Sequence, residues 1–285
     1  MKKLLLIIIA TALCSLFALG QTSLEQIKSN YEAEAIYHTS ARSYIKDGKK
    51  HRIGCFGKKM LPEFEISSEG KITYQKYISQ RKTGLVLGIG AFAGLIGYSL
   101  LFDYDNLDNP DNNLAMASYG AGLAFAGAGI YNSIKLERNL EKSIWLRNRD
   151  IFQEEEVRKR YEVETIYMFG SSRYIKGGEK NTVGFLGRKM KPEFEISPEG
   201  MAVFQQYRSQ EKTALILMGA GLAALIGSFF IVDFDDVSNP NNFLAGATYG
   251  AGLAITGFSL NYVIKSQRNF KKAIWLRNRD VLSRK

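Results

Sequence analysis

The heptapeptide IWLRNRD occurs twice in this chain, at Ile144–Asp150 and again at Ile274–Asp280. Extending the comparison outward at the same offset of 130 residues aligns Tyr31–Phe152 with Tyr161–Leu282 without a gap. Roughly half of the aligned pairs are identical, which indicates a duplicated module larger than the heptapeptide. The heptapeptide is therefore the end of a unit that the chain contains twice.

A charged segment joins the two copies. We predict repeat 1 over residues 21–152, a linker over 153–160 and repeat 2 over 161–285. The linker sequence contains no proline or glycine, and Glu155 precedes Lys159 by four residues, the favourable spacing for an ion pair on a helix. A helical linker is therefore expected. The same spacing relates two further pairs, Glu154 with Arg158 and Glu156 with Arg160.

The first twenty residues have the features of a signal peptide. Two lysines precede an apolar run that ends on small residues, which predicts export with cleavage before Gln21. If it is not cleaved, the same segment is a membrane anchor. The chain carries 38 Lys and Arg against 28 Asp and Glu. Export argues against a nucleic-acid partner, so anionic lipid headgroups or envelope polymers are the expected partners of this positive charge.

The cysteines and histidines argue against a catalytic or metal centre. After removal of the signal peptide only Cys55 remains, so no intrachain disulfide is available. The equivalent residue in repeat 2 is Phe185, which predicts a buried apolar position. His38 and His51 correspond to Met168 and Asn181, so neither a histidine-based site nor a cofactor is expected.

The polar part of each repeat predicts a β-hairpin followed by a helix. In SYIKDGKKHRIG and RYIKGGEKNTVG, the dipeptides Asp47-Gly48 and Gly177-Gly178 suit the positive φ angles of a two-residue turn. Farther on, Ser197 and Pro198 favour a helix start, because serine caps a helix and proline suits its first position.

Four uncharged stretches of roughly twenty residues follow, two in each repeat. As helices they are about 30 Å long, which is the thickness of the hydrocarbon core of a bilayer. Because glycine and alanine make them less apolar than leucine-rich spans, a soluble helical core is the alternative. The predicted fold class is a mainly α membrane protein with a β-hairpin, a helix, a transmembrane helical hairpin and an amphipathic helix in each repeat. The four spans cover residues 83–102, 114–134, 213–232 and 244–264.

Small residues at four-residue spacing predict how these helices pack. In lipid, close backbone approach through small side chains drives helix association. The predicted packing faces consist of Gly84, Gly88, Gly90, Ala93, Gly94, Gly97, Ala117, Gly120, Ala121 and Ala124 in repeat 1, with Ala223, Gly227, Ala247, Gly250, Ala251 and Ala254 in repeat 2.

Two topological signals disagree. An even number of spans makes the repeats parallel, and export places the polar parts in the periplasm and the loops between spans in the cytoplasm. The expected location is the inner membrane. However, the basic residues Arg81, Lys82, Lys135 and Arg138 flank the outer side, which inverts the positive-inside rule. Hairpins that dip into the membrane without crossing it are the alternative.

The loops between the spans offer candidate ligands for calcium. Asp103, Asp105, Asp108 and Asp111 are hard oxygen donors at nearly alternating positions. The second loop retains fewer acidic residues, and a polar turn at Asn109-Pro110 explains the composition equally well.

The two tryptophans mark a candidate interfacial segment at the end of each repeat. An amphipathic helix against headgroups favours Trp145 beside Arg147, and Trp275 beside Arg277. In the alternative, tryptophan packs on its own hairpin domain and the arginines pair with Asp150.

The order of a hairpin, KPEFEISPEG, YRSQEKT, a glycine-rich apolar pair and RNFKKAIWLRNRD resembles a group of exported membrane-hairpin proteins of Bacteroidota that carry one such unit. The resemblance covers nearly the whole mature chain and implies no particular activity.

The sequence favours a non-enzymatic envelope protein with a structural or interaction role, whose partners are lipid and either a second copy or another envelope protein. A channel or transporter subunit is the alternative, with Ser118 and Thr248 as polar groups in the spans. An enzyme ranks third, because we find no nucleophile paired with a base, no metal cluster and no phosphate-binding loop.

Overall fold

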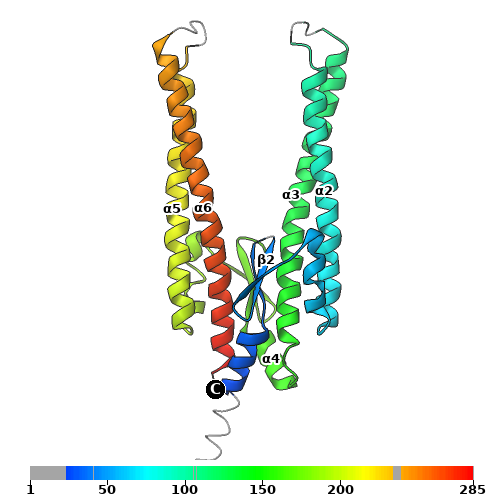
Figure 1. Ribbon diagram of the computed structural model, residues 1–285, viewed down its shortest axis with the longest axis vertical. Helices are drawn as coiled ribbons and strands as arrows, with labels where there is room; N and C mark the ends of the chain where they lie inside the picture. The colour runs from blue at the N-terminus through cyan, green and yellow to red at the C-terminus, as the bar shows by residue number, and fades with distance from the viewer. Residues whose placement is uncertain (1–23, 41, 105, 107, 234–238, 285) are drawn as a thin grey trace, which may run out of the picture. The chain divides into compact units, whose positions relative to one another are not determined.

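The computed structural model describes residues 24–40, 42–104, 106, 108–233 and 239–284. The predicted signal peptide lies outside this range. The described chain is mainly helical (Figure 1). A helix over residues 24–34 comes first.

Two antiparallel pairs of long helices dominate the structure (Figure 1). We call α2 (Ser68–Leu101) and α3 (Asp111–Arg149) the first hairpin, and α5 (Pro198–Ile231) and α6 (Pro240–Leu282) the second hairpin. Each pair belongs to one of two compact units. The predicted spans are the outer halves of these helices. The predicted amphipathic helices are not separate elements, because α3 and α6 continue through them without a break.

Serine caps tie the start of one helix to the end of its neighbour. The hydroxyl of Ser67 accepts a hydrogen bond from Gly70 N at 3.0 Å and donates to Asp150 Oδ2 at 2.6 Å. Ser197 makes the same two bonds, with Gly200 N at 3.0 Å and Asp280 Oδ2 at 2.6 Å. The predicted cap at Ser197 is confirmed, with Pro198 in the first turn. The last residue of IWLRNRD therefore fixes the base of each hairpin.

A seam of mostly small residues, one every seven positions, holds the helices of each hairpin together. Seven residues are two helical turns, so the positions form one stripe that faces the neighbouring helix. Where the seam is closest, a Cβ added to Gly94 would lie 2.5 Å from Gly122 Cα, and one added to Gly221 would lie 3.1 Å from the Gly252 carbonyl oxygen. Larger side chains there would force the helices apart. The clearest example is α6, where Ala245, Gly252, Ser259, Ser266 and Ala273 are all buried.

Within each hairpin, most of the positions predicted from four-residue spacing do not contact the neighbouring helix, so this part of the prediction is wrong. Four glycines of α2 do meet the neighbouring helix. A Cβ added to Gly84 would lie 3.0 Å from Asn132 Nδ2, and one added to Gly97 would lie 3.2 Å from Ser118 Oγ. The pair Gly90 and Gly94 is also confirmed, since added Cβ atoms would lie 2.9 Å from Phe125 Cγ and 2.5 Å from Gly122 Cα. Four-residue spacing occurs on several faces of a helix rich in glycine and alanine, so it did not identify the contact face. The exposed alanines are Ala93, Ala117, Ala121, Ala124, Ala223, Ala247, Ala251 and Ala254, and the glycines whose added Cβ would meet nothing within 4 Å are Gly88, Gly120, Gly227 and Gly250.

The strands form two small three-stranded sheets, one strand more per repeat than the predicted hairpin. β2 (Ser43–Lys46) pairs antiparallel with β3 (Lys49–Arg52), and the turn residues Asp47 and Gly48 have φ angles of 49° and 66°. This hairpin is as predicted. β5 (Arg173–Lys176) and β6 (Glu179–Thr182) follow the same pattern. The added strands, β1 (Tyr37–Ser40) and β4 (Ile166–Met168), are too short for a clear alternation of apolar and polar residues.

The linker forms helix α4 (Glu155–Glu164). The predicted pair of Lys159 with Glu155 is present at 2.9 Å. Arg160 instead pairs with Glu164 at 3.4 Å, and Arg158 donates to the Gln153 carbonyl at 3.0 Å.

A disulfide test separates the observed seam from the faces that four-residue spacing suggests. A Cβ added to Gly97 would lie 3.3 Å from Ser118 Cβ, close to the separation in ordinary disulfides. On a Cys55→Ser background, Gly97→Cys with Ser118→Cys should therefore oxidise to an internal disulfide. Ala93→Cys with Ala121→Cys is the matched control and should stay reduced. Protection from a maleimide-linked polymer measures both, and oxidation of the control pair alone would contradict the seam.

Candidate functional site

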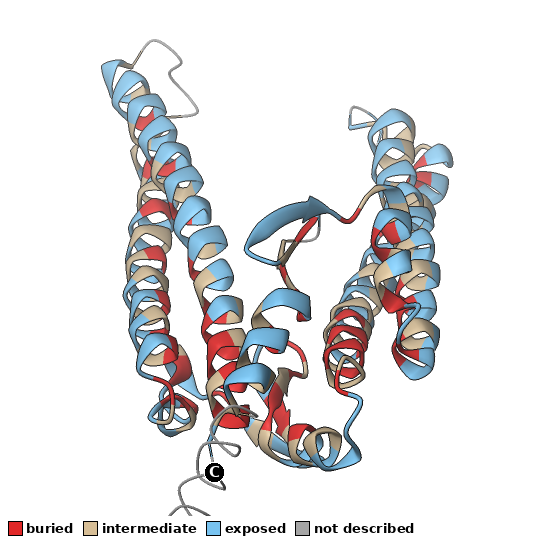
Figure 2. Ribbon diagram, turned by 60° about the horizontal axis from the view of Figure 1, so that its bottom comes forward, coloured by how far each residue is buried: buried red, intermediate tan, exposed pale blue. Residues whose placement is uncertain are grey.

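The outer half of each hairpin presents large apolar side chains to its surroundings. Figure 2 shows buried residues gathered at the base of the hairpins, with mainly exposed surface beyond it. No residue in the most apolar stretch of α2 is buried. Phe92 and Phe230 are 66% and 86% exposed. The described residues include four helices, α2, α3, α5 and α6, that are long and apolar enough to cross a membrane.

Arg147 lies at the centre of the base of the first hairpin and is 1% exposed. Its Nε donates to the Glu63 carbonyl at 3.1 Å, its Nη2 lies 3.2 Å from Glu63 Oε2, and its Nη1 donates to the Glu34 carbonyl. Arg277 is equally buried and makes the corresponding bonds to Glu193, at 3.2 Å to the carbonyl and 2.8 Å to Oε2. The predicted headgroup contact of Arg147 and Arg277 is therefore wrong, because both guanidinium groups are enclosed by protein.

The rest of the heptapeptide clamps other segments of the base. The side chain of Asn148 bonds both backbone groups of Ile36, accepting from N at 2.9 Å and donating to O at 2.7 Å. Arg149 pairs with Asp150 at 2.6 Å and with Glu162 at 2.8 Å. These bonds connect segments far apart in the sequence, so the heptapeptide is a structural clamp.

Electrostatics around Arg147 support the same conclusion. Lys46 Nζ lies 3.0 Å from Glu63 Oε2, and the Tyr44 hydroxyl donates to Glu63 Oε1 at 3.1 Å. Burial alone would raise the pKa of Glu63, but Lys46, together with Arg147 and Tyr44, holds that pKa below its usual value. Burial and the neighbouring Glu63 raise the pKa of Tyr44 to about 12. Glu63 is therefore an ionised carboxylate with several partners, unlike a general base poised near neutral pH.

Both tryptophans pack against protein. Trp145 Nε1 donates to Thr165 Oγ1 at 2.7 Å, and its ring centre lies 4.9 Å from that of Tyr167. The ring centre of Trp275 lies 5.4 Å from that of Tyr37. The alternative of protein packing is correct here, but each tryptophan meets a tyrosine of the other repeat. Consistent with this, β1 groups with the second hairpin and β4 with the first.

His38 and Cys55 lie in different surroundings, the first buried and the second exposed. His38 is buried beside Lys271, and burial followed by the Lys271 charge lowers the pKa of the imidazole. Cys55 is exposed, as is Phe185, so the predicted burial of this position is wrong. The positive φ angles of the flanking Gly54 and Phe56 turn the chain sharply at this point.

Side-chain amides organise the loops between the spans. Asn109 Nδ2 donates to Asp103 Oδ2 at 3.0 Å, and Asn112 Oδ1 accepts from Asp103 N at 2.7 Å. The second loop repeats the first of these bonds, from Asn239 to Asp233 at 2.9 Å. These bonds fit the polar-turn alternative. Asp105 lies outside the described residues, among which no group of three metal-binding side chains occurs. Calcium binding by Asp103, Asp105, Asp108 and Asp111 stays a prediction.

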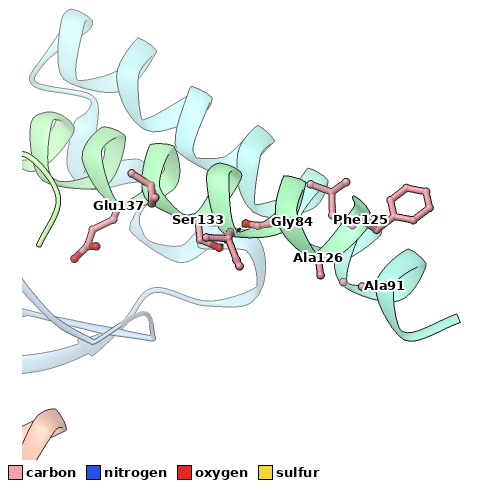
Figure 3. A pocket seen from close by; sticks show the side chains of 11 residues that line it. Gly84, Ala91, Phe125, Ala126, Ser133 and Glu137 are labelled. Atoms are coloured by element: carbon pink, nitrogen blue, oxygen red, sulfur yellow. Dashed lines mark hydrogen bonds between the residues drawn. The ribbon is translucent and has the colours of Figure 1, made fainter. Parts of the chain in front are cut away.

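A lateral groove of 470 Å³ runs between α2 and α3 in the outer half of the first hairpin. Figure 3 shows Gly84 and Ser133 between Glu137 at one end and Phe125 at the other. Small residues form the floor of this groove. These residues are Gly84, Gly88 and Ala91 of α2 with Ala126 and Gly129 of α3.

No protein-family model matches this chain, and comparison with curated proteins and with solved structures gives no match either.

Removing the buried arginine tests the clamp. Arg147→Leu leaves the Glu34 and Glu63 carbonyls without their donor, at a cost of about 1 to 3 kcal/mol for each buried acceptor, while Lys46 and Tyr44 still bind the Glu63 carboxylate. Lys71→Leu is the matched control, because it breaks only the 2.7 Å surface pair with Glu65 and should cost at most about 1 kcal/mol. Denaturation in mild detergent, followed by tryptophan fluorescence, measures both. Equal losses in the two variants would show that Arg147 is not a clamp.

The stability difference between the wild type and Arg147→Leu should also depend on pH, in a direction that the pKa of Glu63 determines. The pKa of Glu63 is lower in the folded chain than its usual value of 4.5. Its stabilising contribution is therefore complete above that pH and is lost as the pH falls below it. The stability difference between the wild type and Arg147→Leu should narrow at pH values below 4.5.

Proposed function

We propose that this protein is a non-enzymatic structural component of the cell envelope, anchored by its two helical hairpins in the inner membrane. The base of each hairpin then lies at the periplasmic surface, where it contacts another envelope protein or a second copy of the chain. The proposal includes cleavage of the signal peptide and agrees with the resemblance to exported proteins of Bacteroidota.

The large apolar side chains exposed on the outer half of each hairpin are the observation that carries this proposal. Soluble monomers rarely expose apolar patches larger than a few hundred Å². Here, bulky side chains such as Val86, Ile89 and Phe92 are all more than 60% exposed on a single helix. A bilayer removes the penalty for this exposure, and in lipid a small-residue seam is a typical helix contact.

The boundaries of the uncharged stretches support insertion. α2 has 34 residues, which corresponds to about 51 Å, so its base projects beyond a core of about 30 Å. Lys82 and Lys135 begin the charged part of the first hairpin, as Lys212 and Lys265 do in the second. Lysines at this depth extend their ammonium groups toward water while their stems stay in the apolar region.

The seam gives little support to a channel within either hairpin. The backbones meet at Gly94 and Gly122 too closely for a water pathway. The hydroxyl of Thr248 donates to the Leu244 carbonyl of its own helix at 2.8 Å, and Ser118 lies against Gly97.

Cysteine labelling tests both crossing and orientation. Cys55 is exposed at the base and is the natural reporter for that side. Asp108→Cys on a Cys55→Ser background reports on the loop. In intact spheroplasts, a membrane-impermeant maleimide should label Cys55 at once and the loop cysteine only after permeabilisation. Immediate labelling of both would mean that the hairpins do not cross, and the reverse pattern would invert the orientation.

A further inference from the structure

We infer that one loop of each repeat, residues 55–59 and residues 185–189, lies among the anionic phospholipid headgroups at the membrane surface. We call these two segments the basic loops. The inference rests on the proposed function, because a membrane must surround the hairpins. It deepens that function by naming the class of lipid and the residues that contact it.

Both basic loops have the same strained backbone. Phe56 and Leu186 each have a φ angle of 50°, in the left-handed region that residues other than glycine rarely adopt. A backbone bond closes each turn: Lys189 N donates to the Val183 carbonyl at 3.1 Å, and the equivalent bond in repeat 1 measures 3.0 Å. Such a conformation persists only where the surrounding structure holds it, so each loop presents its side chains at fixed positions.

Contacts with the long helices place the basic loops at the level of the headgroups. Arg208 Nε of α5 donates to the Leu186 carbonyl at 3.1 Å. In repeat 1, a Cβ added to Gly57 would lie 3.4 Å from Cγ1 of Ile78, the residue equivalent to Arg208. Both helix residues come five positions before the predicted spans, which is about 7.5 Å along a helix. A headgroup layer is roughly 5 to 8 Å thick, so the loops lie beside it.

Each basic loop carries two adjacent basic side chains that are exposed. Among the described residues, none of these side chains has a hydrogen-bond or ion-pair partner. They are Lys58, Lys59, Arg188 and Lys189. The next acidic residues toward the C-terminus, Glu63 and Glu193, are bound by the buried Arg147 and Arg277. The positive charge of the loops is therefore available to an anionic partner.

The apolar side chains beside these charges favour lipid over the other anionic partners. Phe185 is 69% exposed, and Cys55 occupies the equivalent exposed position in repeat 1. A soluble envelope polymer would pair with the basic residues but would leave the phenyl ring in water. A second copy of the chain would bring like charges together. At a membrane surface, apolar side chains enter the boundary of the acyl chains while lysine and arginine meet the phosphates.

Short-range fluorescence quenching tests the depth of the loops. The full mature chain is placed in vesicles of phosphatidylglycerol and phosphatidylcholine, with a fluorescent label on the natural Cys55. A nitroxide attached to the lipid headgroup should quench this label. The matched control is Ile66→Cys on a Cys55→Ser background, because Ile66 is also exposed, at 51%, but lies about 25 Å before the span. Its label should keep its fluorescence.

Lipid preference tests the charge. Electron spin resonance with spin-labelled lipids compares the association of phosphatidylglycerol and of phosphatidylcholine with the protein. Lys58→Gln with Lys59→Gln should lower the preference for phosphatidylglycerol by up to about fivefold for each lysine removed. Lys71→Gln with Lys159→Gln removes the same charge from lysines that have carboxylate partners, at 2.7 and 2.9 Å, and should leave the preference unchanged.

A third label separates failure of this inference from failure of the proposed function. Phe92→Cys on the Cys55→Ser background lies in the middle of the first span, and a nitroxide on the acyl chain should quench its label. If it does not, the hairpins are not in the bilayer and the proposed function fails. If it does, equal quenching at Cys55 and Ile66→Cys overturns only the inference. An unchanged lipid preference in Lys58→Gln with Lys59→Gln also overturns it.

Discussion

The close approach of two helices along a seam of small residues is the constraint on which the rest of the structure depends. One such position in every two turns brings α5 against α6 at Gly221 and Gly252, and α2 against α3 at Gly94 and Gly122. Because the contact stripe is narrow and lined by small side chains, the bulky apolar residues point outward. The seam thus produces the apolar exterior, and the apolar exterior motivates the proposed place in a bilayer.

The base of each hairpin uses a different kind of interaction. There, Arg147 and Asn148 bind backbone groups of segments that lie far away in the sequence, and Asp150 accepts from the serine cap of the neighbouring helix. Bonds to charged groups contribute more than neutral ones when they are buried and geometrically satisfied. Since α2 and α3 continue from the base into the outer half without a break, the clamp also fixes the direction in which each hairpin leaves the base.

The sequence predicted the local features well, because neighbouring residues determine them. The turn at Asp47-Gly48, the cap at Ser197 and the four long apolar helices are all present. It failed where the deciding partner is distant. The local pattern of Trp145 and Arg147 favours a membrane surface, but it does not reveal Glu63, the partner of Arg147, which lies 84 residues away. Trp275 packs against Tyr37 of the other repeat, and the sequence of one repeat alone contains no sign of this contact. The helix-contact face has a seven-residue period, which is hard to recognise because glycine and alanine are abundant on every face of these helices.

The most direct test asks whether lipid surrounds the outward side chains of α2. Ile89→Asp with Phe92→Asp charges the middle of the predicted span, where each aspartate costs about 2.5 to 3.5 kcal/mol in a bilayer. Ile66→Asp with Ile72→Asp changes similarly exposed residues near the base, 51% and 56% against 61% and 66%. After alkaline washing of membranes, the control should stay in the pellet with the wild type, and the first variant should be lost from it. If both variants remain soluble and folded in plain buffer, water and not lipid surrounds these helices.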